Sequence, residues 1–422
     1  MKKMYDVVVS GGGLTGVAAA LAAKRNDLND VLLVERYGFL GGMATSGLVN
    51  PFMSYFKAGM KHEEENQLIF GIFQEILDRL NDLGGLKDKV TFDAEIMKLV
   101  LNRMITEEGV NLLFHTYVTS VNNVRNNGNK IESIRIANKS GNFDVKGKIF
   151  IDCTGDADIA YMAGVPCKIG RDEDGFSQPM TMCFRVANVD RSKLPSREEI
   201  NSIYKEAVSR GEITNPRENV LFFNTIHPDV IHFNTTRIVM KNATNAEELT
   251  EAELMVREQC WEMFNFLKKH IAGFENSYLQ LTAPQIGIRE SRRIVGKYVL
   301  TEEDVLQGKE FDDSICYCAY TVDIHNPAGT GTIIKRLNKG DYYGIPYRCL
   351  LPVNVENLLV AGRPISSTHE AHSSLRIMPT CTAIGEAAGT AAALSITNEI
   401  TPGELDALIL RKKLIENRAI KV

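Results

Sequence analysis

The sequence lacks several features that would assign it to a class directly. No apolar run approaches the ~20 residues that a membrane-spanning helix needs, so no membrane span is expected. A formal net charge of -5 gives no electrostatic reason to expect nucleic acid or an anionic membrane as a partner. The cysteines form no CxxC pair and no histidine-spaced zinc pattern, so neither a metal nor a disulfide relay is predicted.

The N-terminal residues and the cysteines bear on the cellular compartment of the protein. The first residues, Met1 to Tyr5, run directly into an apolar strand, which leaves no room for a signal peptide. Cys316 and Cys318 alternate within a strand-like run and are interpreted as small apolar core residues. Cysteines of this kind fit a reducing compartment, so the expected location is the cytoplasm.

The length of the chain indicates its organisation. Its 422 residues are more than one compact core usually holds, which favours two domains. The composition, 44% hydrophobic and 24% charged, is that of an ordinary globular protein. The chain shows no internal repeat and no low-complexity linker.

A glycine-rich turn near the N-terminus carries the strongest local signal. The strand Val7–Val9 is followed by GGGLTG, in which Gly11, Gly13 and Gly16 occupy the glycine positions of GxGxxG. The first glycine allows the turn, the second lets a pyrophosphate approach the backbone, and the third lets the following helix pack closely. Glu35 ends the next strand, nineteen residues after Gly16, where a carboxylate accepts hydrogen bonds from an adenosine ribose. We therefore expect a dinucleotide, although the same turn could occur in a unit without a ligand.

A second glycine-rich loop favours a flavin over a nicotinamide. Residues 38–47, GFLGGMATSG, follow the acidic strand directly, where a domain that binds only NAD normally continues into a helix. A loop at this place can close over a larger dinucleotide, but by itself it could be a surface loop. An NAD-dependent dehydrogenase stays as an alternative.

The middle of the chain mixes helix and strand signals. A stripe of Leu254, Cys260, Trp261, Phe264 and Leu267 predicts the buried face of a long helix. Helices are expected at 63–83, from Asp93 through Glu108, after the capping boxes that begin at Ser196 and Thr301, and at 251–270. Strands are expected at 110–114, 117–124, 131–136, 148–152, 219–226, 231–240 and 314–324, with a turn at 126–129.

The last strand-loop-helix unit explains how the two ends of the chain are related. An apolar strand at 358–360 precedes a polar loop, and Pro379 suits the first turn of a small-residue helix in which Gly385 and Gly389 permit close approach. If this unit packs against the first one, the middle must leave that domain and return to it. The sequence thus predicts an α/β protein with a discontinuous Rossmann-like domain, residues 1–165 and 351–422, and an inserted α+β substrate domain, residues 166–350.

These segments together resemble a known family. The chain is similar to the bacterial FAD-dependent oxidoreductases with a glutathione-reductase-like fold, near the fumarate reductase and aspartate oxidase branch. The matching segments are GGGLTG with Glu35, GFLGGMATSG, IDCTGDADIA, GIRESRRIVGKYVLTEED, and YGIPYRCLLP through AGRPISSTHEAHSSLRIMPTCTAIGEAAGTAAA. They run from the first strand to the last helix. The chain departs from the family near Ser373 and Glu386, where relatives often have glycine and glutamine.

The resemblance implies FAD as the cofactor and a set of residues that contact it. It implies that the glycines of the first turn bind the pyrophosphate, that Glu35 binds the ribose, and that the last unit meets the flavin ring. The implied FAD contacts are Gly11, Gly13, Leu14, Thr15, Gly16, Glu35, Arg36, Gly41, Gly42, Met43, Ala44, Val118, Thr154, Gly155, Asp156, Gly362, Arg363 and Thr380.

Catalytic candidates come from loops that these units place near the ring. His369 and His372 could move a proton near neutral pH, and an arginine such as Arg376 could bind a carboxylate through two hydrogen bonds. Arg289, within the cluster 289–293, and Arg348 are further candidates, although these arginines could instead pair with carboxylates and join the domains.

The sequence therefore predicts an FAD-dependent oxidoreductase that transfers hydride between the flavin and a small polar substrate, such as one that bears a carboxylate. The electron acceptor is not specified by the sequence. A flavin-binding electron carrier or sensor without turnover stays as a second alternative.

Overall fold

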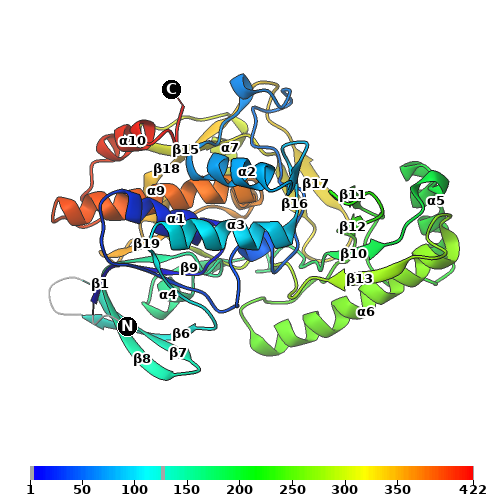
Figure 1. Ribbon diagram of the computed structural model, residues 1–422, viewed down its shortest axis with the longest axis horizontal. Coiled ribbons are helices and arrows are strands. Elements are labelled where there is room, and N and C mark those ends of the chain that lie inside the picture. Colours follow the sequence, from blue (N-terminus) through cyan, green and yellow to red (C-terminus); the bar gives the residue numbers. More distant parts are fainter. Residues whose placement is uncertain (1–3, 125–128, 422) are drawn as a thin grey trace.

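The computed structural model describes residues 4–124 and 129–421, and the turn predicted at 126–129 falls largely outside this range. A parallel sheet and the helices against it occupy one side of the molecule, and an antiparallel sheet with a long helix occupies the other (Figure 1). The expected α/β class with a Rossmann-like parallel sheet is confirmed. None of the helices in the described ranges is long and apolar enough to cross a membrane.

The main sheet has the strand order β5-β2-β1-β8-β7-β6, and β19 pairs with β8. Pairs among β5, β2, β1, β8 and β19 are parallel, while β7 pairs antiparallel with both β8 and β6. Because β8 is long, β7 pairs with its first half and β19 with its last residues. The strands are β1 (Met4–Ser10), β2 (Val31–Val34), β5 (Asn111–Leu113), β6 (Tyr117–Val124), β7 (Lys130–Asn138), β8 (Gly141–Asp152) and β19 (Leu358–Val360).

The apolar run of β1 follows from its central place in the sheet. Val7 and Val9 belong to a hydrophobic core on one face, and Val8 belongs to another core on the opposite face. A strand that is covered on both faces needs a continuous apolar run because successive side chains point to opposite sides.

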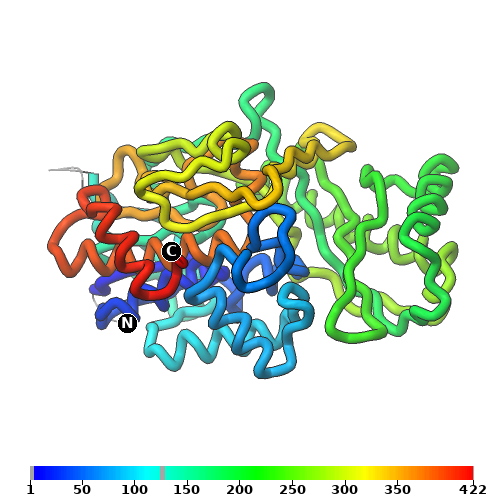
Figure 2. Tube along the Cα trace, turned by 90° about the horizontal axis from the view of Figure 1, so that it is seen from above, coloured from blue at the N-terminus to red at the C-terminus, as the bar shows by residue number. Residues whose placement is uncertain are grey.

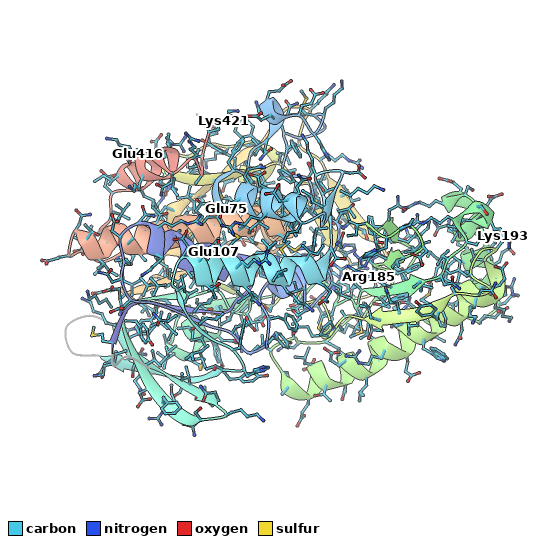
Figure 3. All side chains as sticks on the ribbon, viewed as in Figure 1. Glu75, Glu107, Arg185, Lys193, Glu416 and Lys421 are labelled. Carbon is cyan, nitrogen blue, oxygen red and sulfur yellow. The ribbon has the colours of Figure 1, made fainter. Side chains whose placement is uncertain are left out.

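Helices from both ends of the chain contribute to the hydrophobic core on the first face. They are α1 (Leu14–Arg25), α2 (Gly71–Asp82), α3 (Ala94–Glu107), α8 (His369–Leu375), α9 (Met378–Thr397) and α10 (Ala407–Glu416), and the short α4 (Asp158–Met162) belongs to the other face. Asp93 caps α3 as expected, accepting hydrogen bonds from the backbone N–H groups of Glu95 and Ile96. The helix expected at 63–83 is shorter, since Glu64–Asn66 form only a 3-10 turn before α2. On the outer surface, Glu75 of α2 and Glu107 of α3 both form salt bridges with Arg79 of α2 (Figure 3 labels the two glutamates).

Close contact between α1 and α9 joins the two ends of the chain, as Figure 2 shows in blue and orange. A Cβ added to Gly385 would lie 2.1 Å from the Thr15 carbonyl oxygen, and one added to Gly389 would lie 2.1 Å from the Ala19 carbonyl oxygen. These two glycines therefore let the helix backbones touch. The prediction that the last unit packs on the first is confirmed by this contact and by the β19–β8 pair.

A buried carboxyl group on α9 contacts the start of α2. Glu386 is 4% exposed and accepts a hydrogen bond from the Ile72 N–H at 2.9 Å. Burial raises the pKa of Glu386 to about 7 from the usual 4.5. The folded protein therefore keeps this proton at a pH where the unfolded chain loses it. The stability that this proton gives is present below pH 4.5 and is lost as the pH rises through about 7.

Glu386→Gln should remove this pH dependence. The amide oxygen can still accept the Ile72 N–H, and the side chain no longer ionises. The unfolding free energy of the variant relative to the parent should rise between pH 5 and pH 8 by about 1–3 kcal/mol. Urea unfolding at both pH values measures the difference. A difference that does not change with pH would show that Glu386 does not titrate in this range.

A second lobe has its own hydrophobic core, formed mainly by residues 180–288. Its antiparallel sheet has the order β11-β12-β10-β13, and it carries α5 (Arg197–Ser209) and α6 (Ala246–His270). The strands are β10 (Phe184–Ala187), β11 (Phe222–Asn224), β12 (Ile231–Phe233) and β13 (Tyr278–Thr282). Ser196 caps α5 through the expected capping box.

The stripe predicted for α6 is wrong in part. Leu254 and Trp261 are 65% and 52% exposed, while Val256, Met263 and Phe266 are buried with Cys260 and Leu267. The helix is apolar on more than one side, so its periodicity alone does not select the face that meets the sheet.

The shorter elements lie outside the main sheet and the antiparallel sheet of the second lobe. Residues from Leu300 to Leu351 share the core of α1 and α9, although the sequence analysis places the domain boundary at residue 350. Thr301 caps α7 (Glu302–Leu306) as expected. The remaining strands form four antiparallel pairs: β3 (Leu86–Lys87) with β4 (Thr91–Phe92), β9 (Cys167–Ile169) with β14 (Arg292–Ile294), β15 (Ser314–Cys318) with β18 (Tyr343–Pro346), and β16 (Val322–His325) with β17 (Thr332–Lys335).

Candidate functional site

A cavity of about 630 Å³ runs from the first glycine turn to the second lobe. Its walls come from the carboxyl ends of β1, β2, β8 and β19, the loop after β2, the second lobe and the β16–β17 hairpin. Ligands of open parallel sheets bind at this edge. Among the implied FAD contacts, Gly16, Ala44 and Thr380 do not line the cavity within the described part of the chain, and the others do.

The three glycines of the first turn serve different structural roles. Gly11 has φ +101°, and a Cβ there would lie 2.3 Å from the Cys153 carbonyl oxygen. A Cβ on Gly16 would lie 1.8 Å from the Gly11 carbonyl oxygen, so Gly16 serves packing and lies behind the cavity wall. A Cβ on Gly13 would meet nothing closer than Gly42 Cα at 3.7 Å, and Gly13 begins α1 without a side-chain cap. The open space beside Gly13 leaves the N–H groups of the first turn of α1 free to bind a phosphate.

Glu35 occupies the position expected of a ribose ligand. Its side chain accepts hydrogen bonds from the backbone N–H groups of Gly12 at 2.5 Å and Tyr37 at 2.8 Å. Burial raises the pKa of this carboxyl group despite those two donors. Each oxygen has a further lone pair for a hydroxyl group. The residues present thus fit the adenosine half of FAD, with Gly13 open to the phosphates.

Glu35→Ala should weaken FAD binding about 10–100-fold, the value of one or two hydrogen bonds to a charged group. It should also lower stability, because the N–H groups of Gly12 and Tyr37 lose their acceptor. Equilibrium dialysis of FAD measures the loss. The FAD affinity of Glu35→Gln, which keeps one acceptor oxygen, should lie between those of the parent and the alanine variant. An unchanged FAD affinity in the alanine variant would mean that the ribose is bound elsewhere.

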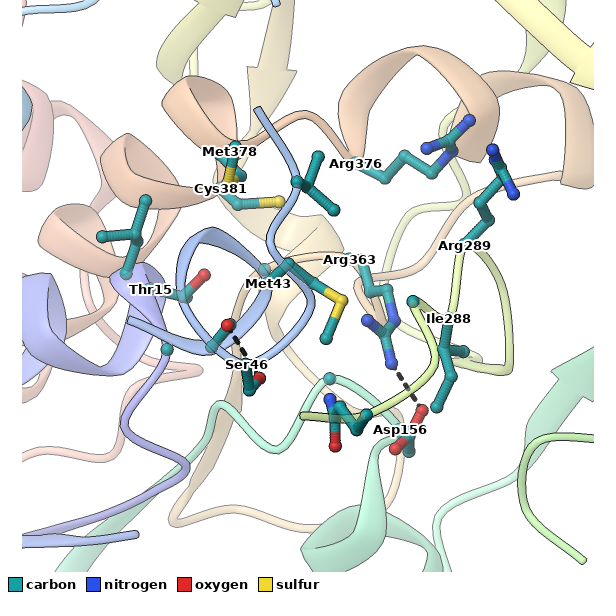
Figure 4. Close-up of a pocket in the computed structure, with 18 of the residues that line it drawn as sticks. Thr15, Met43, Ser46, Asp156, Ile288, Arg289, Arg363, Arg376, Met378 and Cys381 are labelled. Carbon is teal, nitrogen blue, oxygen red and sulfur yellow. Dashed lines mark hydrogen bonds and ion pairs between the residues drawn. The ribbon is translucent and has the colours of Figure 1, made fainter. Parts of the chain in front are cut away.

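The second glycine loop is attached to the first turn. The Gly41 N–H donates to the Gly12 carbonyl at 2.8 Å, and a Cβ on Gly42 would lie 2.8 Å from Gly13 Cα. This contact presents Met43 and Ser46 to the cavity, whereas Ala44 is buried beneath the loop (Figure 4).

An ion pair connects the segments after β8 and β19. Arg363 Nη2 donates to Asp156 Oδ1 at 2.6 Å, and Ser291 Oγ donates to the same oxygen (Figure 4). Asp152, at the end of β8, accepts hydrogen bonds from the Thr154 N–H and hydroxyl groups, which shapes the turn, and burial raises its pKa to about 6. Asp158 pairs with Arg292 at 2.9 Å; the N-cap of α4 is Ala157.

Arg289 and Arg376 face each other at the far end of the cavity (Figure 4). Arg289 donates to the Pro179 carbonyl and the Thr181 hydroxyl, and neither arginine forms an ion pair with a carboxylate among the described residues. Burial, and then the charge of Arg376, lower the pKa of Arg289 to about 9, so it is still cationic at neutral pH. Two guanidinium groups that have no carboxylate ion-pair partner in the described ranges give this end a site for an anion.

Two extended segments form the walls beside these arginines. On one, every second residue lines the cavity: Arg217, Asn219, Leu221 and Phe223. On the other, the register of the hairpin places Asp323 opposite Ile334 and His325 opposite Thr332, and all four line the cavity. Tyr320 also lines it and donates to Asp323 at 3.2 Å. The candidates predicted from the sequence do not include Arg217, Asn219, Leu221, Phe223, Tyr320 or Asp323, although the two-residue spacing at 217–223 was a usable signal.

The predicted histidines lie elsewhere. His369 is buried with its Nδ1 2.9 Å from Glu290, which also pairs with Arg293. His372 is buried, and burial with nearby arginines holds its pKa well below the usual value. Neither histidine lines the cavity in the described ranges, because the turn of α8 directs Arg376 toward it instead.

The placement of Arg348 corrects the interpretation of that residue. Arg348 pairs with Asp313 through Nε at 2.8 Å and Nη2 at 3.1 Å, and its side chain is half-exposed outside the cavity. Arg348 does not lie on a strand; it belongs to a 3-10 turn, Tyr347–Leu350, that follows β18, and its side chain points to the surface. A strand assignment alone does not give that direction.

The match to a protein family agrees with a flavin site. The sequence matches the family model described as FAD dependent oxidoreductase over residues 6–414. A search of curated proteins finds no match. The fold is similar to a geranylgeranyl bacteriochlorophyll reductase-like protein from Thermoplasma acidophilum, with 13% identity, a TM-score of 0.48, and coverage of 99% of this chain and 84% of that chain. It is also similar to p-nitrophenol 4-monooxygenase PnpA from Pseudomonas putida, with 9% identity, a TM-score of 0.49, and coverage of 99% and 85%.

Proposed function

The chain belongs to the family of FAD-dependent oxidoreductases, and from this premise we propose that it transfers hydride between FAD and a small substrate that bears a carboxylate. FAD, when bound, supplies the two-electron centre for such a transfer. The observation that carries the proposal is the pair Arg289 and Arg376, which faces the cavity without a carboxylate partner in the described part of the chain.

The protein's own residues divide into two groups in this proposal. The glycine turns, Glu35 and the Arg363–Asp156 pair hold the cofactor. Arg289 and Arg376 hold and orient the carboxylate, since a guanidinium group matches its two oxygens. The proton that accompanies hydride transfer moves through polar groups that line this end of the cavity. The carboxylate of Asp323 can accept a proton, and the Tyr320 hydroxyl group donates a hydrogen bond to that carboxylate. This replaces His369 and His372 in that role.

The finer architecture belongs to the same proposal. We infer a glutathione-reductase-like FAD domain, residues 1–165 and 351–422, into which residues 166–350 are inserted. Only part of this insertion forms the substrate side, since buried residues between Leu300 and Leu350 pack in the core of α1 and α9. Arg217, Arg289 and the β16–β17 hairpin, which belong to that insertion, supply the far wall of the cavity. An electron carrier has no need for a pair of arginines in the wall of a cavity, which favours turnover over the carrier alternative.

Binding of simple carboxylates tests the proposal. The flavin-loaded protein is titrated with acetate and benzoate, and with acetamide and benzamide as neutral matches, while the flavin absorbance is followed. At least one acid should perturb the spectrum and bind at least about tenfold more tightly than its amide, as expected for a charge-assisted contact. Equal binding of the acid and amide, or no effect from either acid, would contradict the carboxylate assignment.

A further inference from the structure

Arg237 connects the second lobe to the β16–β17 hairpin. Its side chain is 1% exposed, and Nη1 donates to Glu218 Oε1 at 3.0 Å and to the Gly329 carbonyl at 2.9 Å. Glu218 in turn accepts the Gly331 N–H, so the second half of the hairpin loop is held at Gly329 and Gly331 (Figure 1 shows β16 and β17 beside β11 and β12). A buried arginine with this many partners has a fixed geometry.

The same guanidinium group determines where the proton of His325 lies. Arg237 Nη2 is 3.3 Å from His325 Nδ1. A guanidinium group only donates, so Nδ1 must accept and cannot carry a proton. The neutral ring then has its proton on Nε2. The Thr332 hydroxyl lies 3.2 Å from the same Nδ1 and can donate to it as well.

The surroundings of His325 also favour its neutral form. Burial, and then the charges of Arg289, Arg376, Arg217 and Arg237, hold the pKa of His325 well below its usual value. The opposing charge is Asp323, whose Oδ2 lies 3.7 Å from Nε2. That distance is longer than a hydrogen bond. The Nε2–H group therefore lies in the cavity wall without a close acceptor among the described residues.

We propose that Arg237 is a positioning residue that fixes His325 as the neutral Nε2–H tautomer, so that His325 donates a hydrogen bond to an oxygen of the substrate. The oxygen is that of a carbonyl, carboxylate or hydroxyl group. His325 then binds and polarises this oxygen, and it does not serve as a base. The inference shares with the proposed function the location of the substrate, but the tautomer of the ring does not depend on that function.

Nitrogen NMR of the flavin-loaded protein, with ¹⁵N-labelled histidine rings, tests the tautomer. The signals of His325 are assigned from their absence in His325→Gln. We expect an unprotonated Nδ1 and a protonated Nε2 at every pH from 5.5 to 8.5. In Arg237→Gln, which removes the guanidinium donor to Nδ1, part of the His325 signal should shift to the Nδ1–H tautomer. A parent spectrum with a protonated Nδ1, or one that titrates, would overturn the inference.

Thr332→Val is the matched control because it removes the other partner of Nδ1 and leaves Arg237 in place. Its His325 signals should match those of the parent. If they change to the other tautomer, Thr332 and not Arg237 sets the proton, and the assignment of Arg237 is wrong. This comparison decides the matter even if Arg237→Gln does not fold.

Two substitutions of His325 separate its ring nitrogens. Glutamine places its amide N–H₂ near the position of Nε2, whereas asparagine reaches only that of Nδ1. Binding of acetate or benzoate should weaken about tenfold more in His325→Asn than in His325→Gln, the value of one hydrogen bond to a charged group. Equal losses would overturn the donor role. If the parent binds neither acid, the carboxylate proposal fails, and the NMR result still decides the tautomer.

Discussion

Gly11→Val is expected to abolish FAD binding. The added Cβ would lie 2.3 Å from the Cys153 carbonyl oxygen at the end of β8, and a β-branched residue would have to adopt φ +101°. Overpacking and a positive φ each cost about 1–3 kcal/mol, so FAD affinity should fall at least about 100-fold. The ratio of flavin absorbance to protein absorbance after gel filtration measures the loss.

Gly84→Val is the control for backbone strain without a clash. Gly84 has φ +68°, and nothing lies within 4 Å of the Cβ position. This variant should lose about 1–2 kcal/mol of stability from the positive φ and keep its FAD. If Gly11→Val retained FAD as well as Gly84→Val does, the first turn would not be the pyrophosphate site.

Replacing both Arg289 and Arg376 with methionine should have the second large effect. The two guanidinium groups face the same end of the cavity, and each should contribute about 1.5–3 kcal/mol to binding of an anionic group. The catalytic efficiency, kcat/KM for the substrate, should therefore fall about 10²–10⁴-fold while the FAD content stays normal. Arg376→Lys should mainly raise the apparent dissociation constant, because an ammonium group is not a bidentate donor.

Arg348→Met is the matched control for these arginines. Arg348 pairs with Asp313 outside the cavity, so its loss should affect stability slightly and substrate efficiency less than about threefold. Kinetics of flavin reduction compare the variants. An equal loss in Arg348→Met and in the double variant would remove the distinction that the structure makes between them.

The parts of the fold that the sequence predicted are those that local chemistry determines. The GxGxxG turn with Glu35, the Asp93 cap and the two capping boxes depend on residues close in sequence, and the structure has them as expected. FAD as the cofactor was predicted from the second glycine loop and a resemblance, and the family match confirms it. Contact between the chain ends could be predicted because Gly385 and Gly389 leave a visible pattern of small residues.

The parts that could not be predicted depend on tertiary direction. Trp261 is exposed because the sheet covers a different side of α6, and no local signal distinguishes those sides. His369 turns toward Glu290, which is 79 residues away in sequence, so its burial away from the cavity could not be inferred from its loop. His325 lines the cavity on a hairpin that Arg237 contacts from the second lobe, and this contact joins residues 88 positions apart in the sequence.

Anaerobic single-turnover reaction of the bound flavin tests the central claim most directly. The oxidised protein is mixed with a panel of saturated acids and hydroxy acids, and the dithionite-reduced protein with keto acids and unsaturated acids, each alongside its amide. The account predicts that at least one acid bleaches or reoxidises the flavin, that its amide does so at least about 100-fold more slowly, and that the Arg289→Met, Arg376→Met double variant abolishes this preference. An amide that reacts as fast as its acid, or a preference that persists in the double variant, would contradict hydride transfer to a carboxylate-bearing substrate held by these two arginines.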